Sequence, residues 1–152
     1  MYIWKIDKLN EELISGDLSQ RETFKYLLAS SALYALSMIQ YSNANNMDTW
    51  SGLIAGIVTL IGLFFVYRCN GGDGGKNFLI RYLSIGWVVF VRMFVLLMMP
   101  TMMVVFTLQE IYMGGIPDET TIIDLAYMTV IEIIYFLWVA KHINRVARAS
   151  NA

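Results

Sequence analysis

Charged residues are scarce in this chain. Asp, Glu, Lys and Arg make up only 15% of its 152 residues, whereas a soluble domain carries about 25%. Hydrophobic residues account for 57% of the chain and aromatic residues for 14%. So little charge could not cover the apolar segments of a soluble protein of this length, and the composition therefore indicates a membrane protein.

Cysteine and catalytic motifs are equally scarce. Cys69 is the single cysteine, which excludes an internal disulfide and the chemistry of quinone-linked thiol oxidoreductases. The loop at 68–77, RCNGGDGGKN, has the glycines of a phosphate-binding loop, but Asn70 and Asn77 stand where that motif needs Gly and Ser or Thr. We therefore expect no enzyme activity, no cofactor, no metal ion and no nucleic-acid partner.

Four apolar runs predict four transmembrane helices, because about 20 apolar residues cross a hydrocarbon core of about 30 Å. The predicted spans are 24–41, 50–67, 78–109 and 121–141. The third is long enough to tilt or bend, and Pro100 offers a place for a bend. We predict an all-α fold, in which a four-transmembrane-helix bundle occupies 19–148 and is followed by a short tail at 149–152.

The segment 1–18 differs in character, because its apolar residues recur at helical spacing among charged ones: Ile3, Ile6, Leu9 and Leu13. This pattern predicts an amphipathic helix in the cytoplasm or at the membrane interface. We expect it to dock on the inner rim of the protein or on a partner, or else to lie among the lipid headgroups. Acidic residues interrupt the segment, so it does not read as a signal peptide. Ser19 and Glu22 have the spacing of a capping box, which predicts that the next helix begins near Ser19.

Basic residues predict the orientation. Ten of the 11 Lys and Arg residues, all except Arg92, lie before the first span, around the second loop or at the end of the fourth span. The loops at 42–49 and 109–121 contain none. Because cytoplasmic loops carry an excess of Lys and Arg, we predict that both termini are cytoplasmic. A multi-pass protein of a bacterial inner membrane fits this pattern.

Arg92 lies in the middle of the third apolar run. A charge at bilayer depth costs at least about 2.5–3.5 kcal/mol and is kept only where a partner or a water-filled cavity receives it. Residue counting at 1.5 Å per residue places Glu132, on the fourth span, at a similar depth. We predict an ion pair between Arg92 and Glu132, with Asp124 facing a wet vestibule nearer the outer boundary. The pair could be shared with a tyrosine, namely Tyr34, Tyr127 or Tyr135.

Three interpretations of these buried charges stay open. An ion pair could fix the register of two helices without adding stability. It could instead belong to a transport pathway or proton relay, although such a relay usually needs more titratable groups in series. Partner binding is the third interpretation.

The inner rim carries a second candidate site. Arg81 lies about three helical turns before Arg92, which predicts a basic stripe on one helix face. The neighbouring glycines could hold amide groups toward an anion, or could simply form a flexible turn. The candidate contacts for an anion or a lipid headgroup are Arg68, Gly72, Gly75, Lys76 and Arg81.

Small residues predict helix packing. Gly52 and Gly56 form a small-xxx-small pair, which favours close packing of the second span on the first. The alternative is that the pair forms a homodimer face.

The runs LISGDLSQRETFKYLLAS and NGGDGGKNFLIRYLSIGWVVFVR resemble small, uncharacterised four-span bacterial inner-membrane proteins, and the resemblance covers most of the chain. It implies a glycine loop that leads into an aromatic helix with a buried arginine, and it implies no activity. The chain resembles neither small multidrug transporters, which place an essential Glu in their first span, nor rhomboid proteases, whose Gly-x-Ser-Gly is absent.

The sequence therefore predicts a structural or interaction component, such as an accessory subunit of a membrane complex. Its partners would be the lipid bilayer and either another membrane protein or a second copy of the chain. The main alternative is a small transporter or channel that uses Arg92, Glu132 and Asp124. A pore-forming lysis protein is a third interpretation, and lipid binding at the inner rim is compatible with all of them.

Overall fold

A computed structural model describes residues 1–37, 45–115, 117 and 119–150, with side chains described in these ranges except at 33–37. The elements are α1 (Ile6–Ser15), α2 (Gln20–Ser37), α3 (Asn46–Cys69), the 3₁₀ turn η1 (Gly72–Gly74), α4 (Phe78–Met93), the π turn η2 (Phe94–Met98), α5 (Met99–Met113) and α6 (Ile122–Ser150). No strand occurs among the described residues. The prediction of an all-α fold is confirmed.

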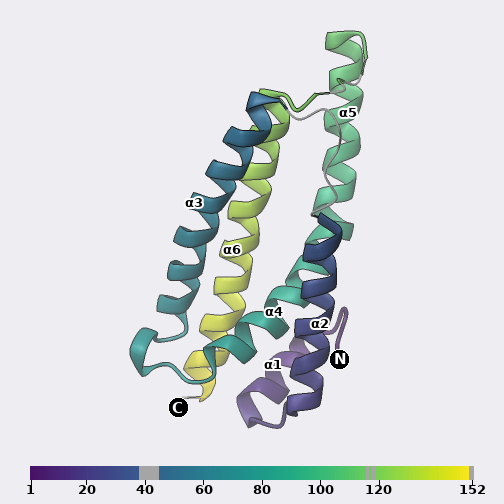
Figure 1. Cartoon of the computed structure of the whole chain (residues 1–152). Helices are drawn as coiled ribbons and strands as arrows, with labels where there is room; N and C mark the ends of the chain where they lie inside the picture. Colours follow the sequence, from purple (N-terminus) through teal and green to yellow (C-terminus); the bar gives the residue numbers. More distant parts are fainter. Residues whose placement is uncertain (38–44, 116, 118, 151–152) are drawn as a thin grey trace.

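The helices form two arms that meet at one end of the molecule (Figure 1). Helices α3 and α6 lie side by side, whereas α5 rises apart from them. Helix α4 crosses obliquely between the arms and packs on both α6 and α2, and α1 packs on α4 and α6. Both chain ends lie at the end where the arms meet, which we call the basal end; the opposite end is the distal end.

Three helices of the described residues are long and apolar enough to cross a membrane: α3, the continuous helical segment Phe78–Met113, and α6. The chain thus has the character of a multi-pass membrane protein. The first predicted span, 24–41, overlaps α2, and its last residues, 38–41, lie outside the described residues.

The long third helix contains the π turn η2, which ends two residues before Pro100. Proline has no backbone N–H and its ring collides with the carbonyl four residues earlier, so it disturbs the regular hydrogen bonding of a helix. Side chains hydrogen-bond the carbonyls of this region. Thr101 Oγ1 donates to the Leu97 carbonyl at 2.6 Å, and Tyr127 Oη on α6 donates to the Met98 carbonyl at 2.8 Å. These contacts satisfy carbonyl groups at a depth where water is scarce.

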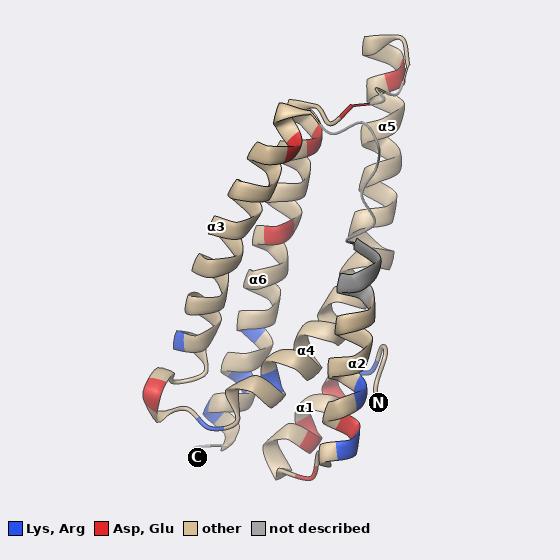
Figure 2. Ribbon diagram, viewed as in Figure 1, with Lys and Arg blue, Asp and Glu red and all other residues tan. Residues whose placement is uncertain are grey.

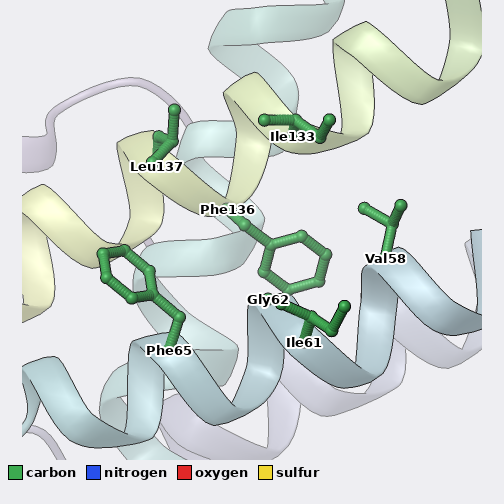
Figure 3. Close-up of a pocket in the computed structure, with 7 residues that line it drawn as sticks. All are labelled: Val58, Ile61, Gly62, Phe65, Ile133, Phe136 and Leu137. Carbon is green, nitrogen blue, oxygen red and sulfur yellow. The ribbon is translucent and has the colours of Figure 1, made fainter.

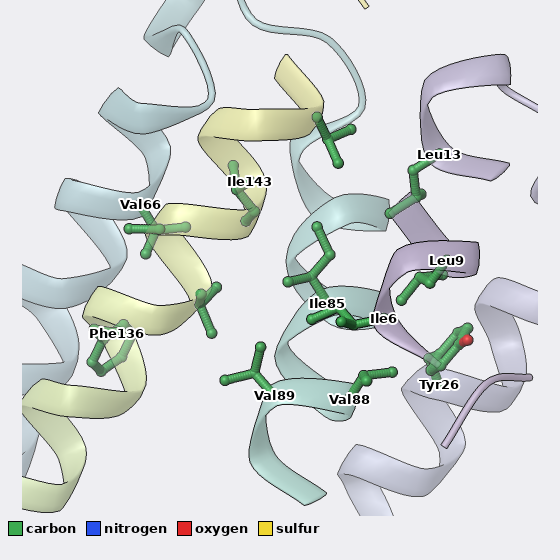
Figure 4. Packing of buried hydrophobic residues seen from close by; sticks show 13 residues of the cluster. Ile6, Leu9, Leu13, Tyr26, Val66, Ile85, Val88, Val89, Phe136 and Ile143 are labelled. Carbon is green, nitrogen blue, oxygen red and sulfur yellow. The ribbon is translucent and has the colours of Figure 1, made fainter. Parts of the chain in front are cut away.

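The hydrophobic core lies at the basal end (Figure 4). From α1 it takes Ile6, Leu9 and Leu13, all nearly fully buried, against Val88 of α4 and other residues of α4 and α6. The predicted amphipathic helix therefore docks on the rest of the chain. It begins at Ile6 rather than before it, so Ile3 lies outside the helix and is exposed.

The two helices of the α3–α6 arm approach closely at Gly62. A Cβ atom at this position would lie 2.3 Å from Cγ of Phe136, so only glycine fits against the ring. A Cβ at Gly52 or Gly56 would meet nothing within 4 Å. The prediction that Gly52 and Gly56 pack the second span on the first is therefore wrong. Helix α3 packs on α6 instead, and the small residue that matters lies further along α3.

Candidate functional site

Arg92 makes its contacts with the N-terminal segment. Its Nε donates to the backbone carbonyl of Trp4 at 2.8 Å, and its guanidinium carbon lies 5.7 Å from the centroid of the Trp4 ring. A cation over an indole face is attracted by the ring quadrupole. Arg92 thus fastens the segment that leads into α1 to the end of α4.

Glu132 has a different partner, because its Oε1 accepts a hydrogen bond of 2.5 Å from Thr59 Oγ1 on α3. The described salt bridges do not include an Arg92–Glu132 pair, so that prediction is wrong. Residue counting assumes that the third and fourth spans stand parallel, whereas α4 crosses the basal end obliquely (Figure 1). Of the three tyrosines suggested as partners, Tyr127 contacts the η2 region and the Tyr135 hydroxyl lies beside Gly86 of α4. The side chain of Tyr34 lies outside the described residues.

Asp124 caps the start of α6. Its Oδ2 accepts from the Thr121 amide at 2.9 Å, while the Thr121 hydroxyl accepts from the Asp124 amide at 3.3 Å. This reciprocal pair is a capping box, which satisfies amide groups that the first turn of a helix leaves without partners. Gln109 Nε2 of α5 donates to Asp124 Oδ1 at 3.0 Å. Asp124 therefore joins α5 to α6, and these contacts, rather than a vestibule, engage its carboxylate.

A second capping box lies beside it at the distal end. Asn45 and Asp48 cap α3 reciprocally. Asp48 Oδ1 also accepts from Thr120 Oγ1 at 2.5 Å, which ties the start of α3 to the segment before α6. The distal ends of three helices are thus held by side-chain hydrogen bonds and carry acidic rather than basic residues (Figure 2).

Polar contacts also hold α1 on α6. Arg145 Nη1 lies 3.3 Å from Asp7 Oδ1, and the Asn10 amide nitrogen lies 3.3 Å from His142 Nδ1. Asn10 is buried, and its Oδ1 has no partner among the described residues. Before α1, the Tyr2 hydroxyl donates to Glu12 at 2.5 Å, and this hydrogen bond raises the pKa of Tyr2 above its usual value.

Arg81, a candidate of the inner rim, is almost fully buried at 3% exposure. Its Nη1 donates to Asn70 Oδ1 at 3.0 Å and its Nη2 to Ser150 Oγ at 2.7 Å, while its Nε has no partner among the described residues. It thus connects the end of α3 to the end of α6. Arg81 and Arg92 engage opposite sides of the basal end and do not form one open basic stripe.

The glycine loop forms a tight turn. Gly71 has φ 104°, which L side chains rarely adopt. The amides of Gly74 and Gly75 donate to the carbonyls of Gly71 and Gly72, so they are not presented to an anion. Lys76 is exposed, and its carbonyl accepts from Asn70 Nδ2 at 3.3 Å. Among the residues predicted to contact an anion at the inner rim, Arg81 is buried and hydrogen-bonded within the protein. Gly72, Gly75 and Lys76 belong to the turn.

Arg68 lines a hollow of about 410 Å³ between the basal ends of α3 and α6, which we call the basic hollow. Opposite it on α6 are Asn144 and Arg148, and Arg148 Nε donates to Asn144 Oδ1 at 3.0 Å. Arg68 also lies over the Phe64 ring, at 5.8 Å from its centroid. The hollow therefore has one arginine on each wall.

An apolar groove of about 300 Å³ lies further along the same two helices (Figure 3). We call it the α3–α6 groove. Its walls include Ile61 and Phe65 of α3 and Ile133 and Leu137 of α6, with Gly62 and Phe136 at its floor. No polar side chain lines it.

The sequence identified the unusual charged residues but not most of the residues that contact them. It gave no partner role to Trp4, Thr59, Asn70 and Asn144, which receive or orient the charged groups. A search for polar residues at helical spacing from Arg148 would have identified Asn144, because it lies four residues earlier on the same helix face. Nothing in the local sequence signals Trp4 or Thr59, because both contacts join distant segments.

Comparison with protein-family models, curated proteins and solved structures finds no match to this chain. The resemblance to small four-span bacterial inner-membrane proteins stays a prediction. Among the described residues no group of three or more His, Cys, Asp or Glu side chains could hold a metal ion.

Proposed function

We propose that the protein is a four-span component of a bacterial inner membrane, with α2 as the described part of the first span and both termini in the cytoplasm. The distribution of charge supports this orientation. Lys and Arg residues gather at the basal end, where both chain ends lie (Figure 2). Cytoplasmic segments of membrane proteins carry such an excess, so the basal end would face the cytoplasm.

In this proposal the protein is a structural or interaction component. We favour the role of an accessory subunit in a larger membrane complex. The observation that carries this proposal is how little of its apolar surface the chain covers itself. In the most apolar stretch of each of the three long helices, only 11–17% of the residues are buried inside the chain. Lipid or another protein must cover the remainder.

Helix α5 is the surface we assign to the partner. Helix α3 packs along α6, whereas α5 reaches α6 through side-chain hydrogen bonds such as that of Gln109 to Asp124. Met99, Met103 and Val104 are half exposed or more. Methionine side chains are flexible and polarizable, and they adapt to the surface of a partner.

A small transporter or channel receives less support. A polar pathway needs groups that pass a proton or ion from one to the next. Here Arg92 contacts Trp4, Glu132 contacts Thr59, and Asp124 caps α6. The three charges belong to separate local networks, each of which fastens one element to another.

The first test is native mass spectrometry of the protein extracted with its surrounding lipid at ordinary expression level. A stoichiometric second polypeptide is the expected result. A lone chain would contradict the accessory-subunit role, and a homo-oligomer would restrict the partner to a second copy.

Site-specific photocrosslinking locates the surface. A photoreactive residue at Met103 on α5, which is 71% exposed, should capture the partner. The matched control is Leu60 on α3, which is 70% exposed and also faces outward from a membrane helix. Equal capture from both positions would contradict the assignment of α5.

A further inference from the structure

The α3–α6 groove and the basic hollow lie on one exposed face of the same helix pair. On α3, Phe65 follows Ile61 by four residues and Arg68 follows Phe65 by three. Residues at these spacings share a helix face. The apolar walls of the groove therefore continue into the walls of the hollow.

Helix α6 shows the same continuity. Ile133 and Leu137 line the groove, and Asn144 and Arg148 follow at intervals that keep to one helix face. Arg148 lies eleven residues beyond Leu137, a rise of about 16 Å along the helix. That distance is close to half of the hydrocarbon thickness of about 30 Å. An acyl chain whose headgroup sits in the hollow would thus reach the groove.

The electrostatics of the hollow favour an anion. None of the salt bridges among the described residues involves Arg68, Arg81 or Arg148. The residues that line the hollow include two arginines and no acidic residue. The C-terminal ends of α3 and α6 each contribute roughly half a negative charge, which is less than the positive charge of Arg68 and Arg148 together.

Arg148 is held in position for such a ligand. Its Nε is bound to Asn144 Oδ1, which orients the planar guanidinium while its two terminal nitrogens remain to donate. A guanidinium matches the geometry of phosphate oxygens and can bind two of them at once. Behind the hollow, the buried Arg81 holds Asn70, which also lines it.

We propose that this face binds one anionic phospholipid, with its phosphate between Arg68 and Arg148 and one acyl chain in the α3–α6 groove. Basic pockets between membrane helices on the cytoplasmic side are suited to anionic headgroups. The site goes beyond the proposed interaction role and would stand if no second polypeptide were found.

The test uses the full chain in nanodiscs that contain equal amounts of phosphatidylglycerol and phosphatidylcholine with identical acyl chains. Native mass spectrometry then measures which lipid stays bound after extraction. Phosphatidylglycerol should be retained preferentially. Removal of each arginine, by Arg68→Gln and Arg148→Gln, should lower its retention about fivefold.

Two further variants keep the test decisive. Arg21→Gln removes a positive charge from the same end of the molecule, on α2 and outside the hollow, and should leave retention within about twofold of the original protein. The double variant Arg68→Lys/Arg148→Lys keeps the charge and should retain most of the preference, even if the glutamine variants fold poorly. Equal retention of the two lipids, or an equal loss with Arg21→Gln, would overturn the proposal.

The groove is tested separately. Ile61→Trp places a large ring over the groove and should lower phosphatidylglycerol retention severalfold, whereas Ile57→Trp, one turn away on α3 and similarly exposed, should not. Displacement of the lipid by millimolar inorganic phosphate, together with no effect of Ile61→Trp, would show that the hollow binds free phosphate and would overturn the lipid assignment.

Discussion

Arg92 and Glu132 should contribute to stability independently. Because Arg92 contacts Trp4 and Glu132 contacts Thr59, the effects of Arg92→Leu and Glu132→Leu on the free energy of unfolding should add to within about 0.5 kcal/mol. Chemical denaturation in mixed micelles measures the free energy of unfolding of the single and double variants.

A second cycle is the control for this prediction. Glu132→Gln and Thr59→Val remove two groups that are in contact, so these changes should couple by about 0.5–1.5 kcal/mol. If the double variant of Arg92 and Glu132 instead recovered much of the loss of the single variants, the two residues would form the ion pair that the sequence suggests.

Asn70 should matter because it receives a buried arginine. Asn70→Ala removes the acceptor of Arg81 Nη1 where both side chains are buried, and should lower the free energy of unfolding by about 1.5–3 kcal/mol. Asn70→Asp keeps an acceptor and adds a countercharge, so it should be much less harmful. Thermal unfolding followed by circular dichroism compares the two variants, and an equal loss in both would contradict the role of this hydrogen bond.

At the residue scale, the sequence reveals which groups are unusual but not what they contact. A charge within an apolar run is visible without a structure, and so Arg92, Glu132 and Asp124 could be selected. Only the capping role of Asp124 had a local signal, the Thr-x-x-Asp spacing at 121–124. The partners Trp4 and Thr59 are fixed by the direction of α4 and by the pairing of α3 with α6, and neither can be read from local spacing.

At the level of helices, the α3–α6 arm depends on the absence of a side chain at Gly62. Gly62→Ala would force a Cβ against the Phe136 ring and should destabilise the protein by about 1–3 kcal/mol. Gly56→Ala on the same helix meets open space and should be neutral or stabilising by up to about 1 kcal/mol, because alanine favours a helix.

The smaller side chain of Phe136→Leu should restore part of the loss in Gly62→Ala. Denaturation midpoints of the three single variants and the Gly62→Ala/Phe136→Leu double variant measure this. Equal tolerance of alanine at positions 56 and 62 would contradict the packing at Gly62.

Helix ends were easier to predict than helix neighbours. Gly16 ends α1 with φ 78°, a left-handed conformation that glycine favours. Ser19 Oγ accepts from the Glu22 amide at 3.2 Å, as the Ser-x-x-Glu spacing predicts. Caps are local, so sequence spacing suffices. Gly52 and Gly56 misled because a small-residue motif predicts that a helix can pack closely, not which helix it meets.

For the whole molecule, the proposed orientation gives a labelling test. Cys69 is the only cysteine, so Cys69→Ser provides a background for single reporters. In that background, Glu119→Cys near the distal end should react with a membrane-impermeant maleimide on intact cells. Asp73→Cys in the basal loop should react only after lysis, because the basal end carries most Lys and Arg residues. Labelling of Asp73→Cys in intact cells would contradict the orientation.

Membrane class could be predicted from composition, since apolar runs long enough to cross a bilayer are typical of membrane spans. The arrangement of the helices in two arms could not be predicted in this way. Lipid provides no hydrophobic drive for one helix to choose another, so the pairing depends on particular contacts such as Gly62 with Phe136, on the oblique course of α4 and on the docking of α1.

The contact between Gly62 and Phe136 also has a consequence for biosynthesis. About half of the chain separates the two residues, and Phe136 lies in α6. During synthesis, α3 is complete long before its partner has been made. Until α6 enters the membrane, the notch at Gly62 faces lipid or an insertion factor, so the α3–α6 arm can form only after α6 has been synthesised.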